Sequence, residues 1–460
     1  ALALGSAVLA SFLFGLASFY LVRGRSREDL IHGMGGVLAS TPVSNSVLLF
    51  ARWLGAVAYL VTLLFALMVT MMVLQLVRGE APLQPLVFVE MYGLMLIPTI
   101  FLAASVAVLC DSFSPLMGKG GDVVYFMLWI GQFSAMPSAI EKHSERLGAL
   151  GAVDISGIAV IAQRLKQLYH TEHFSIGSSP FDPTLAPIIF ADFWTADMAG
   201  MRIMCALLAM LPLLPAVAIF HRFSPDRVKN VGTARRFSIW ALINRLFQPA
   251  TRLVRPLLSL AARLPGIAGQ AMADLALTLM SNPVAVVALI GVSIASAVAS
   301  ANGLAGVLAF AIACWGILIS DLSVRDFQSA TESLTAAVNG GASRRYLRHM
   351  LVTALLGLLF SAVVLTRWVA INPLGAGALV TGIFALSACA SLLGRSTRTG
   401  KTFLALFLFG LYFSLQIKDI PWLDIIGANG SATVTSVSAQ LVAALVMCAV
   451  GYEANRRLKA

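Results

Sequence analysis

Charged residues are scarce in this sequence. Asp, Glu, Lys and Arg together make up 12% of the 460 residues, about half the share of an ordinary globular protein. Apolar residues make up 59%, and this excess is sustained along the chain. So few charges cannot cover the surface of a soluble protein of this length, and the composition therefore predicts an all-α polytopic membrane protein.

Cysteine is rare as well, and its distribution excludes a disulfide framework. The five cysteines lie within apolar segments, far from one another in the sequence. We interpret them as small core residues that form neither disulfides nor a metal cluster. They are Cys110, Cys205, Cys314, Cys389 and Cys448.

Motifs for metals and nucleotides are missing. His143, His170 and His173 share one segment but lack the His-Glu-x-x-His spacing that places two imidazoles on one helical face. Residues 394–402 look like a phosphate-binding loop, but five residues separate the two glycines where four are needed. The segment also joins two apolar runs, whereas a phosphate-binding loop follows a strand. We therefore predict no catalytic residue, no metal and no cofactor in this chain.

Eleven apolar runs are long enough to cross a hydrocarbon core of about 30 Å. They lie at residues 1–22, 51–77, 86–110, 122–138, 198–221, 283–301, 304–320, 351–370, 374–394, 402–417 and 432–452. Because successive spans alternate in direction, the side of one loop determines the side of all the others.

Basic residues are distributed unevenly between the two sides. With residues 23–50 inside, the cytoplasmic side receives 24 of the 32 basic and 10 of the 21 acidic residues. The inner side then carries +14 and the outer side −3, as the positive-inside rule requires. We predict that residues 23–50, 222–282 and 321–350 are cytoplasmic and that residues 138–197 lie outside. The net charge of +11 then reflects orientation, and nucleic acid is not an expected partner.

This topology divides the chain into three parts. Residues 1–221 form a first transmembrane half with the outer insert 138–197, residues 222–282 a basic cytoplasmic linker, and residues 283–460 a second transmembrane half. The linker contains apolar-periodic runs that predict one or two amphipathic helices on the inner membrane surface. Pro249, Pro256 and Pro265 are expected to break them into short pieces.

The two halves repeat the same order of parts. In each, an apolar run ends in a charged segment, residues 25–30 and 321–327, followed by a helical stretch, a small-residue turn and the next span. A Gly-Lys pair precedes an aromatic-rich span at 118–119 and again at 400–401. This order predicts two pseudo-repeated six-helix halves.

The duplication also predicts a missing span. The second half has two runs, 283–301 and 304–320, before its charged segment, whereas the first half has one. We therefore expect a further span upstream of Ala1.

One short motif connects the sequence with a known family. Arg-Glu-Asp at 27–29 precedes Leu-Ala-Ser-Thr-Pro-Val-Ser at 38–44, which leads into a span. The motif resembles that of ABC type-two transporter permeases, whose second span is followed by an acidic, arginine-containing cytoplasmic helix and a Thr-Pro-Val-Ser turn. The resemblance implies two fused six-span halves, each with a coupling helix between its second and third spans and re-entrant helices outside. The insert 138–197 is longer than the usual outer connection of that family.

The same resemblance implies a function. The chain would be the transmembrane permease subunit of an exporter in a bacterial inner membrane, moving an amphiphilic or hydrophobic substrate. It would not itself be an enzyme, since ATP and magnesium would be bound by separate cytoplasmic ATPase subunits. For the charged residues among those expected to contact the ATPase, a role as positive-inside anchors or solvated loop charges stays open. The residues expected to contact the ATPase are Arg25, Arg27, Glu28, Asp29, Thr41, Pro42, Arg325, Asp326 and Glu332.

Four residues within spans are candidates for a substrate path. Glu90 is ionisable close to the end of a span, where charge is costly and often functional, although interfacial snorkelling explains it too. Phe126, Trp129 and Phe409 belong to aromatic-rich spans that either line the path or pack against neighbouring helices and lipid.

Two rival functions stay open: a secondary transporter with internal repeats, and a non-transporting assembly subunit or intramembrane enzyme. No span concentrates the carboxylates and histidines of a proton relay, which disfavours a proton-coupled transporter.

Overall fold

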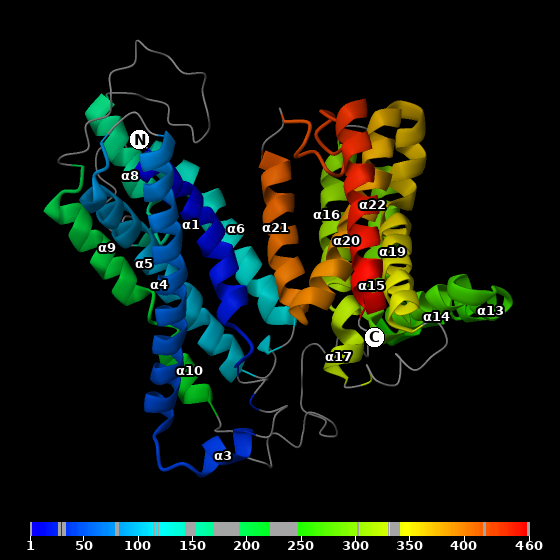
Figure 1. Ribbon diagram of the computed structural model, residues 1–460, viewed down its shortest axis with the longest axis horizontal. Coiled ribbons are helices and arrows are strands. Elements are labelled where there is room, and N and C mark those ends of the chain that lie inside the picture. Colours follow the sequence, from blue (N-terminus) through cyan, green and yellow to red (C-terminus); the bar gives the residue numbers. More distant parts are fainter. Residues whose placement is uncertain are drawn as a thin grey trace. The chain divides into compact units, whose positions relative to one another are not determined.

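A computed structural model of the chain describes residues 2–25, 29, 34–78, 82–113, 116–117, 119–142, 153–169, 193–220, 247–300, 303–329, 331, 341–416 and 420–457. All regular secondary structure within these ranges is helical (Figure 1). The chain divides into two compact units, Ala1–Arg236 and Phe237–Ala460.

The protein is an all-helical, multi-pass membrane protein. Among the described residues, seven helices are long and apolar enough to cross a bilayer, and a bent pair adds an eighth if it is counted as one span. Each of the eleven predicted runs coincides with a helix, and seven or eight of them meet this length and hydropathy criterion within the described residues. Three of the remaining helices have only 16 or 17 residues, or about 24 to 26 Å at 1.5 Å per residue. The fourth, α6, mixes polar residues such as Asp122 and Gln132 into its apolar sequence.

The first unit is organised around one buried helix, α5 (Pro85–Ser112). Helices α1 (Leu2–Val22), α4 (Asn45–Arg78), α9 (Ala196–Leu208) and α10 (Leu213–Ile219) all pack against α5. Most residues of α5 after Phe88 are buried, because alanine, serine and small apolar residues let the neighbouring helices approach closely. Within the described residues, the other helices of this unit are α3 (Met34–Ser40), α6 (Lys119–Lys142) and α8 (Ile158–Tyr169).

The second unit has a corresponding central helix, α20 (Pro373–Thr397). It packs against α19 (Gly341–Ile371), α21 (Gly400–Gln416) and α22 (Val434–Arg457). Helices α15 (Pro283–Val298) and α16 (Leu304–Ile319) pack against α19. Both α5 and α20 begin with proline at the first helical position, where the missing N–H has no partner to lose.

A proline-punctuated segment precedes α15. The 3₁₀ helix η3 (Gln248–Val254) and helix α13 (Arg255–Arg263) each have proline as their second residue, and helix α14 (Gly266–Ser281) begins directly after Pro265. The predicted division of the linker into short helical pieces is therefore confirmed for residues 247–281, while residues 222–246 lie outside the described part of the chain. Helix α14 meets α15 at 98° and packs against α19.

Candidate functional site

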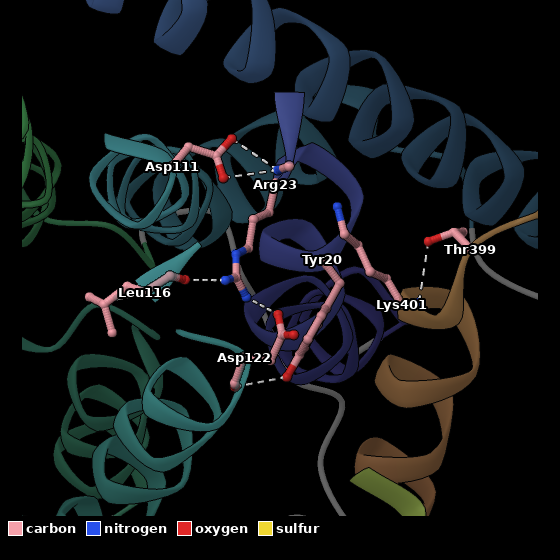
Figure 2. A network of polar contacts seen from close by, with 8 residues as sticks. Tyr20, Arg23, Asp111, Leu116, Asp122, Thr399 and Lys401 are labelled. Carbon is pink, nitrogen blue, oxygen red and sulfur yellow. Dashed lines mark hydrogen bonds and ion pairs between the residues drawn. The ribbon is translucent and has the colours of Figure 1, made fainter. Parts of the chain in front are cut away.

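A buried charge network joins three helix ends in the first unit (Figure 2). Arg23, 4% exposed, directly follows α1 and forms an ion pair with Asp122 in the first turn of α6. Its guanidinium also donates a hydrogen bond to the carbonyl of Leu116. The Tyr20 hydroxyl donates to the carbonyl of Asp122 at 3.1 Å. The end of α1 is thus fixed to the start of α6.

Gly24 extends this network to the end of α5. Its φ of 95° lies in the left-handed region that favours glycine after a helix. In this conformation the Gly24 N–H donates to both carboxylate oxygens of Asp111, at 3.1 and 2.9 Å. The last turn of α5 therefore holds the backbone at the point where α1 ends.

Sequence reasoning missed this network. It treated Arg23 as part of the cytoplasmic segment 23–50, Asp111 as the start of a short loop, and Asp122 as the first residue of the run 122–138. The only local sign is that the two acidic residues bracket one inter-helical connection. They lie 88 and 99 positions from Arg23, so only the packing of the helices brings them to it.

The first predicted coupling segment contains a second ion pair. Asp29 pairs with Arg52, which lies two turns into α4. Arg25 is exposed beside this pair. Arg27 and Glu28, the other two residues predicted here, lie outside the described part of the chain.

The predicted small-residue turn is present between α3 and α4. Helix α3 ends at Ser40 and α4 begins at Asn45, with Thr41 and Pro42 between them. The Thr41 hydroxyl donates to the Leu38 carbonyl at 2.8 Å and so covers an orphan acceptor at the helix end. The predicted boundary is confirmed, while the proposed contact with an ATPase stays a prediction.

The second unit contains its own charge cluster. Asp326, in the short helix α17 (Arg325–Gln328), faces His349 of α19 with 3.9 Å between Oδ2 and Nε2. Arg325 donates to the Thr278 hydroxyl of α14 at 3.3 Å, and Arg348 pairs with Asp274, also of α14, at 2.8 Å. Glu332 lies outside the described residues. The cluster ties α14, α17 and α19 together.

The two clusters share one spacing. Asp29 and Arg52 are 23 residues apart, and so are Asp326 and His349. In both units the acidic residue follows the end of an apolar helix, and the basic residue lies about two turns into the next long helix. Each pair therefore connects a short inter-helical segment with the helix that follows it.

A second arrangement recurs at buried turns. Asp154-Ile-Ser-Gly157 and Asp424-Ile-Ile-Gly427 each close with an N–H bond from the glycine to the aspartate carbonyl at 3.3 Å. Both glycines have positive φ, 76° and 69°. Both aspartates are buried, at 1% and 0% exposure, and accept several bonds from the backbone that follows. Sequence reasoning missed the turns, although the Asp-Ile-x-Gly pattern is visible in both halves.

The two aspartates organise different structures after the turn. Asp154 accepts N–H bonds from Gly157, Ala159 and Val160 at 2.9 to 3.1 Å and so caps α8. Asp424 accepts from the Asn429 and Ser431 backbone N–H groups, each at 3.2 Å.

A buried arginine anchors the first of these turns. Arg202 of α9 is 1% exposed and donates to the carbonyls of Leu94, Met95, Asp154 and Ile155. The Leu94 carbonyl is available because Pro98, one helical turn later within α5, has no N–H to donate. Because of Pro98 in α5, Arg202 in α9 can bond both α5 and the Asp154 turn, and it holds this turn against the middle of α5.

The predicted path residues lie in dissimilar surroundings. Phe126 and Trp129 are buried on α6, with ring centroids 6.0 Å apart, and Trp129 fills the space left by Gly15 of α1. Phe409 is half-buried and packs on Phe413, and Glu90 is half-buried on α5. Their part in a substrate path stays a prediction.

Comparison with protein-family models, curated proteins and solved structures finds no match for the chain.

Proposed function

We propose that the chain is the transmembrane subunit of an ATP-driven transporter, with two coupling segments that receive the movement of separate ATPase subunits. The observation that supports this most directly is the repeated acid–base pair, Asp29 with Arg52 and Asp326 with His349, at one spacing of 23 residues. The resemblance of residues 27–44 to ABC type-two permeases points to the same segments.

A charge pair at this place has a mechanical consequence. It fixes a short segment to the first turns of a long helix, so a push on the segment tilts the helix rather than bending the connection. Helices α4 and α19, of 34 and 31 residues, extend this displacement across the full bilayer. Two such levers in one chain match a transporter driven by paired ATPase subunits.

We further propose that the two units arose by duplication. Both contain a proline-initiated central helix, an Asp-Ile-x-Gly turn with a left-handed glycine, and the 23-residue acid–base spacing. Helix α9, which starts the last span of the first unit, and helix α22 both follow a threonine, Thr195 or Thr433, whose hydroxyl accepts a backbone N–H bond. If the two units are matched at these shared features, α8 and the residues from it to Thr195 are an insertion in the first unit. The full six-span halves belong to this proposal.

The remaining assignments follow from charge and family resemblance. The +14 and −3 distribution supports a cytoplasmic position for residues 23–50, 222–282 and 321–350. The apolar spans support an amphiphilic or hydrophobic substrate, and the resemblance supports export across a bacterial inner membrane. ATP and magnesium then belong to the partner.

The decisive experiment is isolation of the intact chain from its native membrane, with ATP hydrolysis measured after reconstitution. We expect an ATP-binding-cassette subunit to copurify, and Asp29→Arg with Asp326→Arg to reduce coupled hydrolysis severalfold. Adding Arg52→Asp to this double variant restores the first pair with its charges exchanged and should recover part of the loss.

A matched control is Glu453→Gln on α22, which removes the acidic partner of an exposed pair with Arg456. It should leave hydrolysis unchanged. The proposal would be contradicted if no ATPase copurified, or if one copurified and its hydrolysis were normal in the doubly reversed variant.

A further inference from the structure

A cavity of about 290 Å³ lies in the first unit between the end of α1, the start of α4 and the end of α5. Its two sides differ in chemistry. Arg25, Asp29, Arg52 and Asp111 contribute charged groups, two of each sign. Since all three helices end or begin here, this part of the cavity is at the level where lipid headgroups meet protein.

The rest of the cavity wall is apolar. Leu21, Leu49 and Val108 line it from three different helices, and Gly55 leaves space on α4. An added Cβ at Gly55 would meet no atom within 4 Å. The cavity is therefore amphipathic, with charges grouped among otherwise apolar walls.

The apolar wall continues along the outside of α4. Tyr59 lines the cavity and is 47% exposed. At helical spacing the same face of α4 continues through Leu63 and Leu67 to Val73 and Leu74, and the last two are 49% and 45% exposed. An acyl chain leaving the cavity would thus find an apolar path along this helix.

The charge balance selects the headgroup. The two guanidiniums suit a phosphate, while the two carboxylates disfavour a ligand that brings only negative charge and suit an ammonium group. We propose that the cavity binds a zwitterionic phospholipid of the phosphoethanolamine class. The phosphate faces Arg25 and Arg52, the ammonium faces Asp29 and Asp111, and the acyl chains lie along α4.

The size of the cavity agrees with this occupant. Ligand pockets usually enclose about 300–1,000 Å³, so 290 Å³ accommodates a headgroup and the first methylenes but not a whole lipid. Because the Asp29–Arg52 pair forms part of the wall, a bound lipid would also stabilise the first coupling segment.

The test uses the full chain in detergent, titrated with phosphatidylethanolamine that carries a fluorophore on its acyl chain. Fluorescence should rise on binding, and unlabelled phosphatidylethanolamine should compete at least about tenfold better than phosphatidylglycerol, a difference of about 1.4 kcal/mol. Gly55→Leu, which fills the cavity without changing a charge, and Arg25→Gln, at an exposed position, should each weaken binding about tenfold.

The matched control is Gly93→Leu on α5, where an added Cβ also meets no atom within 4 Å but which does not line the cavity. It should bind as the unaltered chain does. Equal competition by the two lipids, unchanged binding in both cavity variants, or no binding by the unaltered chain would each overturn the proposal. If Gly55→Leu does not fold, Arg25→Gln decides the outcome. The titration contains no ATPase, so its result is separate from that of the proposed function.

Discussion

The two units contain the same kind of acid–base pair, but the basic residue differs between them. Each places an acidic residue after an apolar helix and pairs it with a basic residue 23 positions later, but the base is Arg52 in the first unit and His349 in the second. An arginine keeps its charge at every physiological pH, whereas a histidine is charged only when protonated. The attraction between opposite charges in the first pair therefore persists at every physiological pH, whereas in the second pair it requires a protonated histidine.

The buried turns differ in a similar way. In the first unit the Asp154 turn caps a helix and is held by Arg202, which donates to four carbonyls. In the second unit the Asp424 turn leads directly through a short loop to α22, and Gly427 lies against the backbone of Gly375. A common turn is thus stabilised by a buried cation in one unit and by close backbone packing in the other.

The largest expected effect is the loss of the buried cation. Arg202→Leu leaves the carbonyls of Leu94 and Asp154 without their donor in a buried site, and should lower the free energy of unfolding by about 3–5 kcal/mol. Thermal unfolding of the detergent-solubilised chain measures this. Arg456→Leu on α22, at a largely exposed side chain, should change stability by less than about 0.5 kcal/mol. An equal loss of stability in both variants would show that Arg202 does not stabilise the turn.

Substitution of the turn glycines should have the next largest effect on stability. Gly427→Ala forces a side chain into the left-handed region and against the Gly375 backbone, and should cost about 2 kcal/mol or more. Gly157→Ala meets side-chain atoms of Arg202 and Met95 rather than backbone and should cost less. Gly430 has a φ of 71° but open space around it. The loss of stability in Gly430→Ala therefore measures only the cost of the left-handed backbone conformation, about 1 kcal/mol. If Gly157→Ala is the most destabilising of the three variants, the two turns are not stabilised in the different ways described above.

The charge pairs should have the smallest effect on stability. His349→Arg gives the second unit the base of the first. The side chains of this pair are mostly buried, at 12% and 17% exposure, and stability should change by about 1 kcal/mol. Coupled ATP hydrolysis, measured at one pH, should then differ from that of the unaltered chain, because an arginine always carries its charge. The variant Arg52→His tests the same difference in the first unit. Identical rates of hydrolysis for all three proteins would show that the two pairs do not differ in function.

Much of the secondary structure was predictable from local patterns. Each apolar run coincides with a helix, and the turn after Ser40 lies where its Thr-Pro pair predicts, because proline and small residues act on the backbone of their own neighbours. The number of complete spans was less predictable. Helices α15, α16 and α21 are apolar but short, and an apolar run in the sequence does not reveal where its helix ends.

The candidate sites were only partly predictable. Asp29 and Asp326 were selected from the sequence as charges in inter-helical segments, but their partners Arg52 and His349 were not. Arg202 was counted only as a basic residue on the outer side, because nothing near it in the sequence shows that four carbonyls surround it. Its partner carbonyl at Leu94 is released by a proline on a different helix.

The sequence by itself determined that this protein is helical and crosses a membrane, since both follow from the abundance and grouping of apolar residues. The tertiary structure decided which charges meet. Arg23 reaches Asp122 across 99 positions, and Arg202 reaches Met95 across 107. Apolar burial is non-directional and can be summed along the chain, whereas an ion pair or hydrogen bond requires two particular atoms within about 3 Å. Only helix packing sets such distances.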